Sequence, residues 1–234
     1  MEEGEEFFYM LKGDMRLVVV ERGAFRDIPI KEGEVFLLPA RIPHSPQRTA
    51  DTIGLVIERE RLPSEMDCLR YYVDGSNEIL YEKWFHCENL EEFGPLIKEF
   101  FASEQYKTGK PVPGTILEDK PVKQDYQCLL DTPFSLKTWL RSNKEAIDKE
   151  GKKRLFEGNY MSRVYVLGKG SHVPDADIPE TFLWQIEGKS EVEVGNKTYE
   201  FIENQTMLLQ AGETYVLRNS TGGRTLSVVM NAEN

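Results

Sequence analysis

The chain has 234 residues, 40% hydrophobic and 29% charged, which fits a globular protein of one large or two small domains and excludes disordered and coiled-coil classes. Its 29 Lys and Arg against 40 Asp and Glu give a net charge of −11, which argues against nucleic-acid and anionic-lipid partners. No apolar run reaches the roughly 18 residues of a membrane span, so we expect no membrane association. The cysteines Cys68, Cys87 and Cys128 form no Cys-x-x-Cys pair, which indicates a reducing compartment and a cytoplasmic location.

Short strands are predicted over most of the first sixty residues. The expected strands cover residues 6–11, 15–20, 26–30, 35–38 and 52–58. Glycine-bearing turns separate several of them, including Gly13, Gly23 and Gly33. Strands of this length and spacing are typical of an antiparallel sandwich or barrel.

Two helices are predicted in the middle of the chain. Apolar residues recur at helical spacing between Leu90 and Phe101, and Asn89 with Glu92 predicts a capping box. A second helix is predicted after Ser135, and strands return from about residue 160. Between the helices, a proline-rich and charged stretch without a clear period predicts a linker.

An internal repeat organises the whole sequence. Residues 5–13 resemble residues 180–188, and residues 36–44 resemble residues 207–215, with block spacings that differ by four residues. We therefore predict an all-β-dominated chain of two tandem small β-barrels with a few helices. The expected organisation is a catalytic domain over 1–113, a linker over 114–130 and a degenerate second domain over 131–234.

The two copies differ where a metal could bind. Glu6 of the first copy aligns with Thr181 of the second, and His44 aligns with Tyr215. An imidazole and a carboxylate on neighbouring strands can bind one metal ion. The first copy is therefore the candidate active domain, and we expect the second to bind no metal.

The spacing around these residues resembles a known family. Glu6-x6-Gly13 and Gly33-x5-Pro39-x4-His44 are similar to the paired motifs of the cupin superfamily. Longer runs resemble the 3-hydroxyanthranilate 3,4-dioxygenase family; they cover residues 33–48, 69–73, 82–85 and 103–111. Bacterial members carry a second, Cys-bound iron site, so the lack of Cys-x-x-Cys favours the animal-type, two-barrel form.

The resemblance implies a function and a residue-by-residue site. It makes Glu6 and His44 catalytic ligands of Fe(II), and Glu6, Arg48 and Glu58 the substrate-binding residues, with Arg48 on the substrate carboxylate beyond a proline-bearing turn. The implied reaction cleaves the ring of 3-hydroxyanthranilate with O₂ to 2-amino-3-carboxymuconate semialdehyde. That product is the precursor of quinolinate in the kynurenine pathway toward NAD, and we expect a monomer.

One departure from the family bears on activity. The family's third ligand, a His six positions before the glutamate, would fall one residue before Met1. We therefore interpret the chain as N-terminally shortened, expect an unpaired edge on the strand at 6–11, and keep His86 or His172 as substitute ligands. The alternatives are a non-catalytic bicupin that binds a small molecule and, less favoured, a sugar-isomerase-type cupin.

Overall fold

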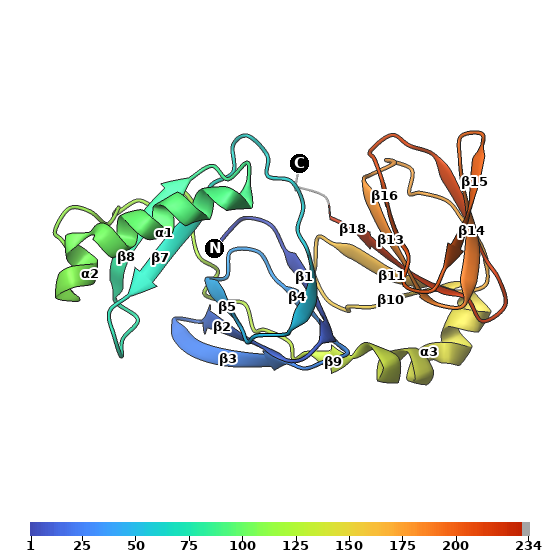
Figure 1. Ribbon diagram of the computed structural model, residues 1–234, viewed down its shortest axis with the longest axis horizontal. Coiled ribbons are helices and arrows are strands. Elements are labelled where there is room, and N and C mark those ends of the chain that lie inside the picture. Colours follow the sequence, from blue (N-terminus) through green and yellow to red (C-terminus); the bar gives the residue numbers. More distant parts are fainter. Residues whose placement is uncertain (231–234) are drawn as a thin grey trace. The chain divides into compact units, whose positions relative to one another are not determined.

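The computed structural model describes residues 1–230, which form two compact units divided between Ser135 and Leu136 (Figure 1). Both units are built mainly from antiparallel strands. The prediction of a β-dominated chain with two tandem β-barrel units and a few helices is confirmed. Within residues 1–230, no helix is long and apolar enough to cross a membrane.

Two sheets face each other in the first unit. The first has the order β6-β1-β4-β9, and the second β3-β2-β5. Their bounds are β1 (Glu6–Lys12), β2 (Met15–Glu21), β3 (Ala24–Ile30), β4 (Glu34–Leu38), β5 (His44–Arg48), β6 (Ile53–Ile57) and β9 (Phe134–Ser135). Alternate side chains from both sheets meet in one core, which contains Phe8 and Phe36 from the first sheet and Leu17 and Ile28 from the second.

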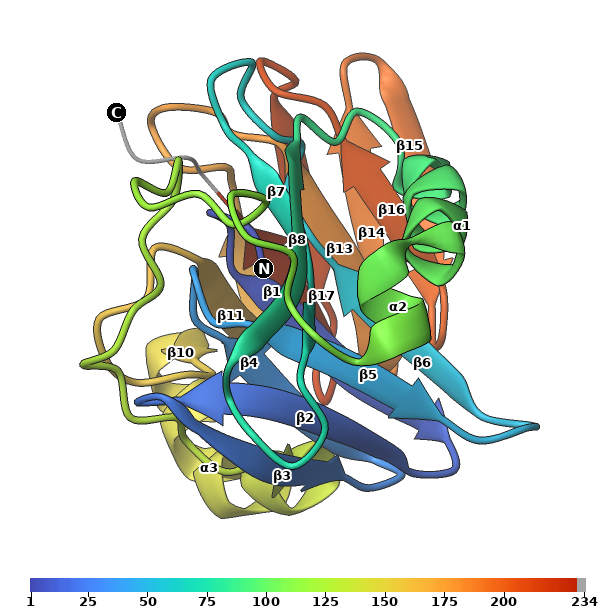
Figure 2. The ribbon, with the colours of Figure 1, turned by 90° about the vertical axis from the view of Figure 1, so that its left-hand side faces the viewer.

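A hairpin and two helices complete the first unit (Figure 2). The hairpin consists of β7 (Asp67–Tyr72) and β8 (Ile79–Phe85), followed by the single turn η1 (Leu90–Glu92), α1 (Phe93–Ala102) and α2 (Glu104–Thr108). Phe100 of α1 is buried against the hairpin and stacks on Tyr71. The predicted capping box of Asn89 and Glu92 is confirmed at the start of η1.

The second unit begins with a long helix, α3 (Leu136–Glu150), and repeats the two-sheet arrangement. Its sheets have the orders β10-β11-β18-β13-β16 and β12-β17-β14-β15. The bounds are β10 (Lys152–Arg154), β11 (Arg163–Leu167), β12 (Gly170–His172), β13 (Thr181–Glu187), β14 (Lys189–Val194), β15 (Lys197–Ile202), β16 (Thr206–Leu209), β17 (Tyr215–Asn219) and β18 (Arg224–Val229).

Strand register confirms the internal repeat. β1 lies between β4 and β6, as β13 lies between β16 and β18. Glu6 pairs with Leu38 in the first unit, and Thr181 pairs with Leu209 in the second. A register shift interrupts each central strand at the same place, just before a glycine with positive φ, Gly13 or Gly188. A residue without Cβ suits that turn, which explains the glycine of the first motif.

Two expectations about strands were wrong. β1 pairs on both sides, with β4 and β6, so the strand at 6–11 has no unpaired edge. The segment between His44 and Arg48 is strand β5 instead of a turn, because Pro46 lies opposite Leu17 of β2 and the strand extends the second sheet.

Residues 114–130 run along the first unit. The Leu130 side chain is buried in that unit's core, and its backbone N–H donates to Glu21 at 2.6 Å. The Gln124 side chain donates to the Val20 carbonyl at 3.3 Å, and the Asp125 N–H donates to the Arg41 carbonyl at 3.1 Å. The segment is therefore part of the packed structure of the first unit.

Candidate metal and substrate site

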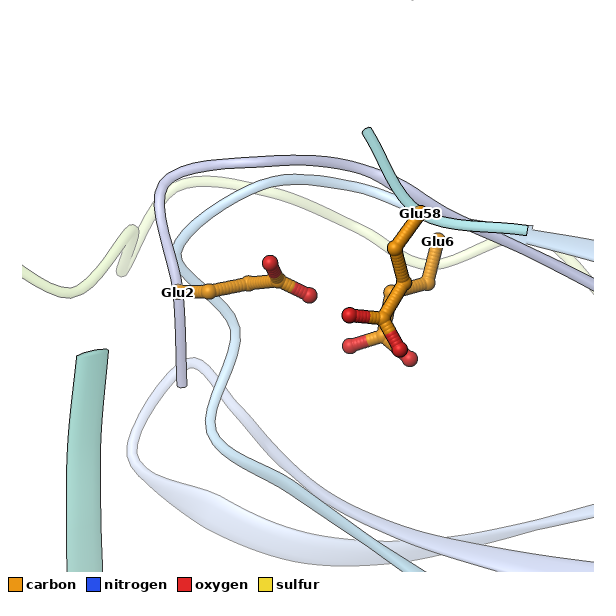
Figure 3. Close-up of side chains that lie close together, drawn as sticks. All are labelled: Glu2, Glu6 and Glu58. Atoms are coloured by element: carbon orange, nitrogen blue, oxygen red, sulfur yellow. The ribbon is translucent and has the colours of Figure 1, made fainter. Parts of the chain in front are cut away.

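The candidate site lies where β1 begins and the neighbouring antiparallel strand β6 ends. Phe7 pairs with Ile57 in an antiparallel register, which sets Glu6 opposite Glu58. Cross-strand neighbours share a face of the sheet, so both carboxylates point to the same space (Figure 3). Glu6 is buried and Glu58 is half-buried. Two residues far apart in the sequence are thus brought together by strand pairing.

His44 reaches the same place from the other sheet. Its Nδ1 lies 2.9 Å from the carbonyl oxygen of Ile42, two residues earlier in the chain. That contact assigns the ring N–H to Nδ1 and orients the ring. The other nitrogen, Nε2, lies 2.7 Å from Oε1 of Glu6. The predicted pair of Glu6 and His44 is therefore in direct contact and shielded from solvent.

A third carboxylate, Glu2, joins the site from the segment before β1. Ligand oxygens of Glu2, Glu6 and Glu58 all lie within 4.8 Å of one another, and Figure 3 shows Glu2 pointing toward the other two from the opposite side. Sequence reasoning missed Glu2 because it lies in an acidic run that resembles a solvated N-terminus. Its four-residue spacing from Glu6 is a weak signal in such a run.

Electrostatics divide these carboxyls into two types. Burial, and then a hydrogen bond to Glu6, raise the pKa of Glu2 well above its ordinary value. Burial also acts to raise the pKa of Glu6, but the charge and hydrogen bond of His44, together with the bond from Glu2, outweigh it and lower the pKa to about 2. Of the two hydrogen-bonded carboxyls, Glu2 is therefore the one in which the protonated form is favoured, and Glu6 the one in which the ionised form is favoured.

Arg61 supports the carboxylates from behind. Its Nη1 lies 2.8 Å from Oε2 of Glu58, and its Nη2 lies 2.7 Å from Oε2 of Glu2. The same guanidinium pairs with buried Asp67 at 3.1 Å. A planar guanidinium with several donors can hold three carboxylates at once and fix their side-chain orientations. Sequence reasoning did not identify Arg61 as part of the site.

Arg48 lies further along β5 than the other candidates. Side chains alternate between the two faces of a strand, so Arg48 and His44, four residues apart, face the same side of β5. The two residues are separated by about 13 Å along the strand. The partner of Arg48 in register is the buried Met15. The Arg48 side chain is exposed and lines a surface pocket next to Met15 and Arg16. The structure therefore groups Glu6, His44 and Glu58, and sets Arg48 on the same face outside that group.

The other two histidines lie outside this group. Nδ1 of His86 contacts the Glu65 carbonyl at 2.9 Å, and Nε2 of His172, which belongs to the second unit, contacts the Gly168 carbonyl at 2.9 Å. Within residues 1–230, Glu2, Glu6 and Glu58 are the one group of three or more potential metal-ligand residues whose ligand atoms lie within 4.8 Å of one another.

The donor set fits a divalent metal ion. With Nδ1 of His44 directed at the Ile42 carbonyl, Nε2 and the adjacent carboxylate oxygen of Glu6 are the two atoms that a metal ion could bind, in place of the contact between them. Imidazole nitrogen with carboxylate oxygen suits Fe, Mn and Zn. Three carboxyls packed together, two of them buried, also repel one another when ionised, and a bound cation would relieve that repulsion.

Comparison with known proteins decides the family. A sequence model described as 3-hydroxyanthranilic acid dioxygenase matches residues 1–101. The 3-hydroxyanthranilate 3,4-dioxygenase of Mus musculus is 46% identical over 97% of this chain and 80% of its own length. The chain belongs to the 3-hydroxyanthranilate 3,4-dioxygenase family. Other members are the proteins of Homo sapiens, 44% identical over 97% of the chain and 80% of their length, and Nematostella vectensis, 43% over 99% and 83%.

Solved structures with a similar chain path were also found. The oxalate decarboxylase of Bacillus subtilis at pH 4.6 is 16% identical, with a TM-score of 0.47, over 97% of this chain and 63% of that one. A mutant of the same enzyme is 14% identical, with a TM-score of 0.45, over 100% of this chain and 65% of that one.

Proposed function

We propose that the chain is a 3-hydroxyanthranilate 3,4-dioxygenase, which opens the aromatic ring of 3-hydroxyanthranilate with O₂ to give 2-amino-3-carboxymuconate semialdehyde. The observation that carries the proposal is the buried contact between Glu6 and His44 in a chain 46% identical to a protein of that name. We assign catalysis to the first unit. The second unit, with Thr181 and Tyr215 at the matching positions, is assigned no metal.

The metal proposed for this site is Fe(II), held by Nε2 of His44 and the carboxylate of Glu6. Fe(II) supplies Lewis acidity and the electrons that O₂ activation requires. The chain's own residues orient the ligands: the Ile42 carbonyl contacts the His44 ring, and Glu2 forms a hydrogen bond with Glu6. Such outer contacts commonly affect metal affinity by about 10–100-fold.

Two further residues are proposed to bind the substrate. Arg48 takes the carboxylate of the substrate, since its guanidinium can bind a carboxylate with two parallel hydrogen bonds. Glu58 accepts a hydrogen bond from the hydroxyl or amine of the ring. Arg61 contacts Oε2 of Glu58, and no hydrogen bond to Oε1 is present within residues 1–230, so Oε1 is the oxygen available to the substrate.

The reaction and the cysteines support a proposed pathway and cellular location for the protein. The product closes to quinolinate, a precursor of NAD, and the reaction belongs to the kynurenine pathway. All three cysteines are free, which supports a reducing, cytoplasmic setting. The proposed monomeric state is measured by light scattering.

The test is O₂ uptake with 3-hydroxyanthranilate after loading with Fe(II), alongside the iron content. A form continued upstream to the relatives' length is assayed in parallel, because the family resemblance places a ligand directly before residue 1. We expect substrate-dependent uptake that is lost in His44→Ala and in Glu6→Gln. Iron-replete protein without uptake in both forms would contradict the proposal.

A further inference from the structure

The second unit contains a pocket at the position that corresponds to the candidate site of the first. Strand register makes Thr181, Tyr215 and Val229 the counterparts of Glu6, His44 and Glu58. All three line one pocket with a volume of about 370 Å³, within the size range of small-molecule sites. The second unit therefore has a cavity at this position, lined by residues other than the histidine and glutamate proposed to bind the metal in the first unit.

Neutral hydroxyl groups form the deep part of this pocket. Thr181, Tyr215 and Ser227 are buried, and the Tyr215 phenol hydrogen-bonds the side chains of Thr181 and Ser227. Thr181 also donates to the Pro179 carbonyl at 3.0 Å. Burial raises the pKa of Tyr215, so the three groups carry no charge at neutral pH. Hydroxyls can both donate and accept, so they suit a polar atom on an organic ligand.

Two exposed lysines line the pocket without an ion-pair partner among the described residues. Lys152 and Lys169 both line it and are exposed. Within residues 1–230, neither ammonium has a carboxylate within ion-pair distance, and that of Lys152 lies 5.0 Å from the centre of the Tyr165 ring. Arg163 also lines the pocket, but its charge is matched by Asp175 at 3.1 Å and by a second aspartate.

The remaining lining makes the pocket amphipathic. Apolar side chains of Leu167, Val173 and Val229 and the ring of Tyr165 form its walls. Glu150 and Asp175 are the carboxylates among the lining residues, and Asp175 is paired with Arg163. A ligand that matches these surfaces has an anionic end toward the lysines, a flat apolar body and a polar atom toward the hydroxyls.

We propose that the pocket of the second unit, lined by Lys152, Lys169, Tyr165, Thr181 and Tyr215, is a binding site for a small aromatic carboxylate. It needs no metal and is separate from the site of the first unit. Its occupation does not depend on the proposed dioxygenase reaction.

The probe is benzoate, added to the whole chain and followed by calorimetry and by amide chemical shifts. We expect saturable binding with a Kd on the order of 0.1–1 mM and shifts at Thr181, Ser227 and Val229. Benzamide, which has the same shape without the charge, and inorganic phosphate, which has charge without a ring, should each bind at least about tenfold more weakly.

Variants identify the site. Replacing both lysines, in K152Q/K169Q, should weaken benzoate binding at least about tenfold, whereas Lys197→Gln, an exposed lysine of the same unit outside the pocket, should leave it unchanged. Because Arg48 of the first unit is itself proposed to bind a carboxylate, the amide shifts at Thr181, Ser227 and Val229 are the signals that report binding to the second unit. Circular dichroism checks that each variant is folded.

Three results would overturn the proposal. These are the absence of saturable benzoate binding at about 10 mM, benzoate shifts that spare Thr181, Ser227 and Val229, and binding at those residues that is unaffected by K152Q/K169Q. Equal affinity for phosphate and benzoate would likewise show that the ring is not recognised. None of these results bears on O₂ uptake, so the proposed dioxygenase function is tested independently of the benzoate site.

Discussion

Arg48 carries the proposed recognition of the substrate in a protein whose net charge of −11 would otherwise repel a carboxylate. We expect Arg48→Ala to weaken 3-hydroxyanthranilate binding by about 1.5–3 kcal/mol, because a charge-assisted bidentate contact is lost. The iron content should not change, since Arg48 does not contact Glu6 or His44. Binding is measured by calorimetry without O₂ and iron by atomic absorption.

The control for this change is Arg141→Ala, an exposed arginine on α3 of the second unit. Arg141→Ala removes the same charge and should leave 3-hydroxyanthranilate binding and the iron content unchanged. Loss of iron in Arg48→Ala would contradict the assigned role, because a substrate ligand does not hold the metal.

The buried thiols should be inert at neutral pH. Burial is the main cause that raises the pKa of Cys68, and that of Cys87, from 9.0 to about 11. At pH 8 only ~0.1% of each is thiolate, the reactive form. We expect iodoacetamide to modify the more exposed Cys128 first, and Cys68 and Cys87 only after unfolding. Mass spectrometry of the digested protein identifies the order.

The same thiols predict a pH effect on stability. Their pKa is higher in the folded state than in the unfolded chain, so their contribution is fully present below pH 9 and is lost as the pH rises toward 11. Rapid modification of Cys68 in the native protein at pH 8 would contradict both statements.

Phe100 is the residue of helix α1 that is buried against the β7–β8 hairpin. The Phe100 ring stacks on Tyr71 with centroids 3.6 Å apart, and Tyr81 lies 5.2 Å away. Phe100→Ala should lower the free energy of unfolding by about 3–5 kcal/mol, because it opens a cavity in this cluster. The measurement is urea unfolding followed by tryptophan fluorescence.

Its neighbour Phe101 provides a matched control. Phe101 is 49% exposed, so Phe101→Ala leaves a smaller cavity and should cost about 1 kcal/mol or less. Equal losses for the two variants would show that the helix is held by other contacts.

At the scale of the molecule, the first unit depends on the chain that follows α2. Val122 and Leu130 are buried, and β9 extends the sheet by pairing with β4. We expect a protein ending at residue 135 to fold, and one ending at residue 113 to be less stable by several kcal/mol, since loss of one buried Leu alone costs about 2–5 kcal/mol. Thermal unfolding by circular dichroism compares the two.

If the shorter form proved equally stable, residues 114–130 would be a true linker, as their prolines and charges indicated. The structure explains why composition misleads at this place. A few contacts, such as Leu130 with the core and Gln124 with Val20, hold an otherwise polar segment, and such contacts leave no periodic signal in the sequence.

The sequence by itself determined the features that depend on local spacing. Alternating apolar residues predicted the strands, the similar blocks ending at Gly13 and Gly188 indicated the repeat, and the repeat singled out Glu6 and His44. These patterns are visible because strand period and turn geometry act over a few neighbouring residues.

Only the tertiary structure decided which distant side chains meet. Glu2 and Arg61 join Glu6 and Glu58 because strand pairing and the folded N-terminal segment bring them together. The pairing of β1 on both sides and the docking of residues 114–130 likewise depend on contacts between residues far apart in the chain. Proximity of this kind follows from how the sheets pack, which no local pattern encodes.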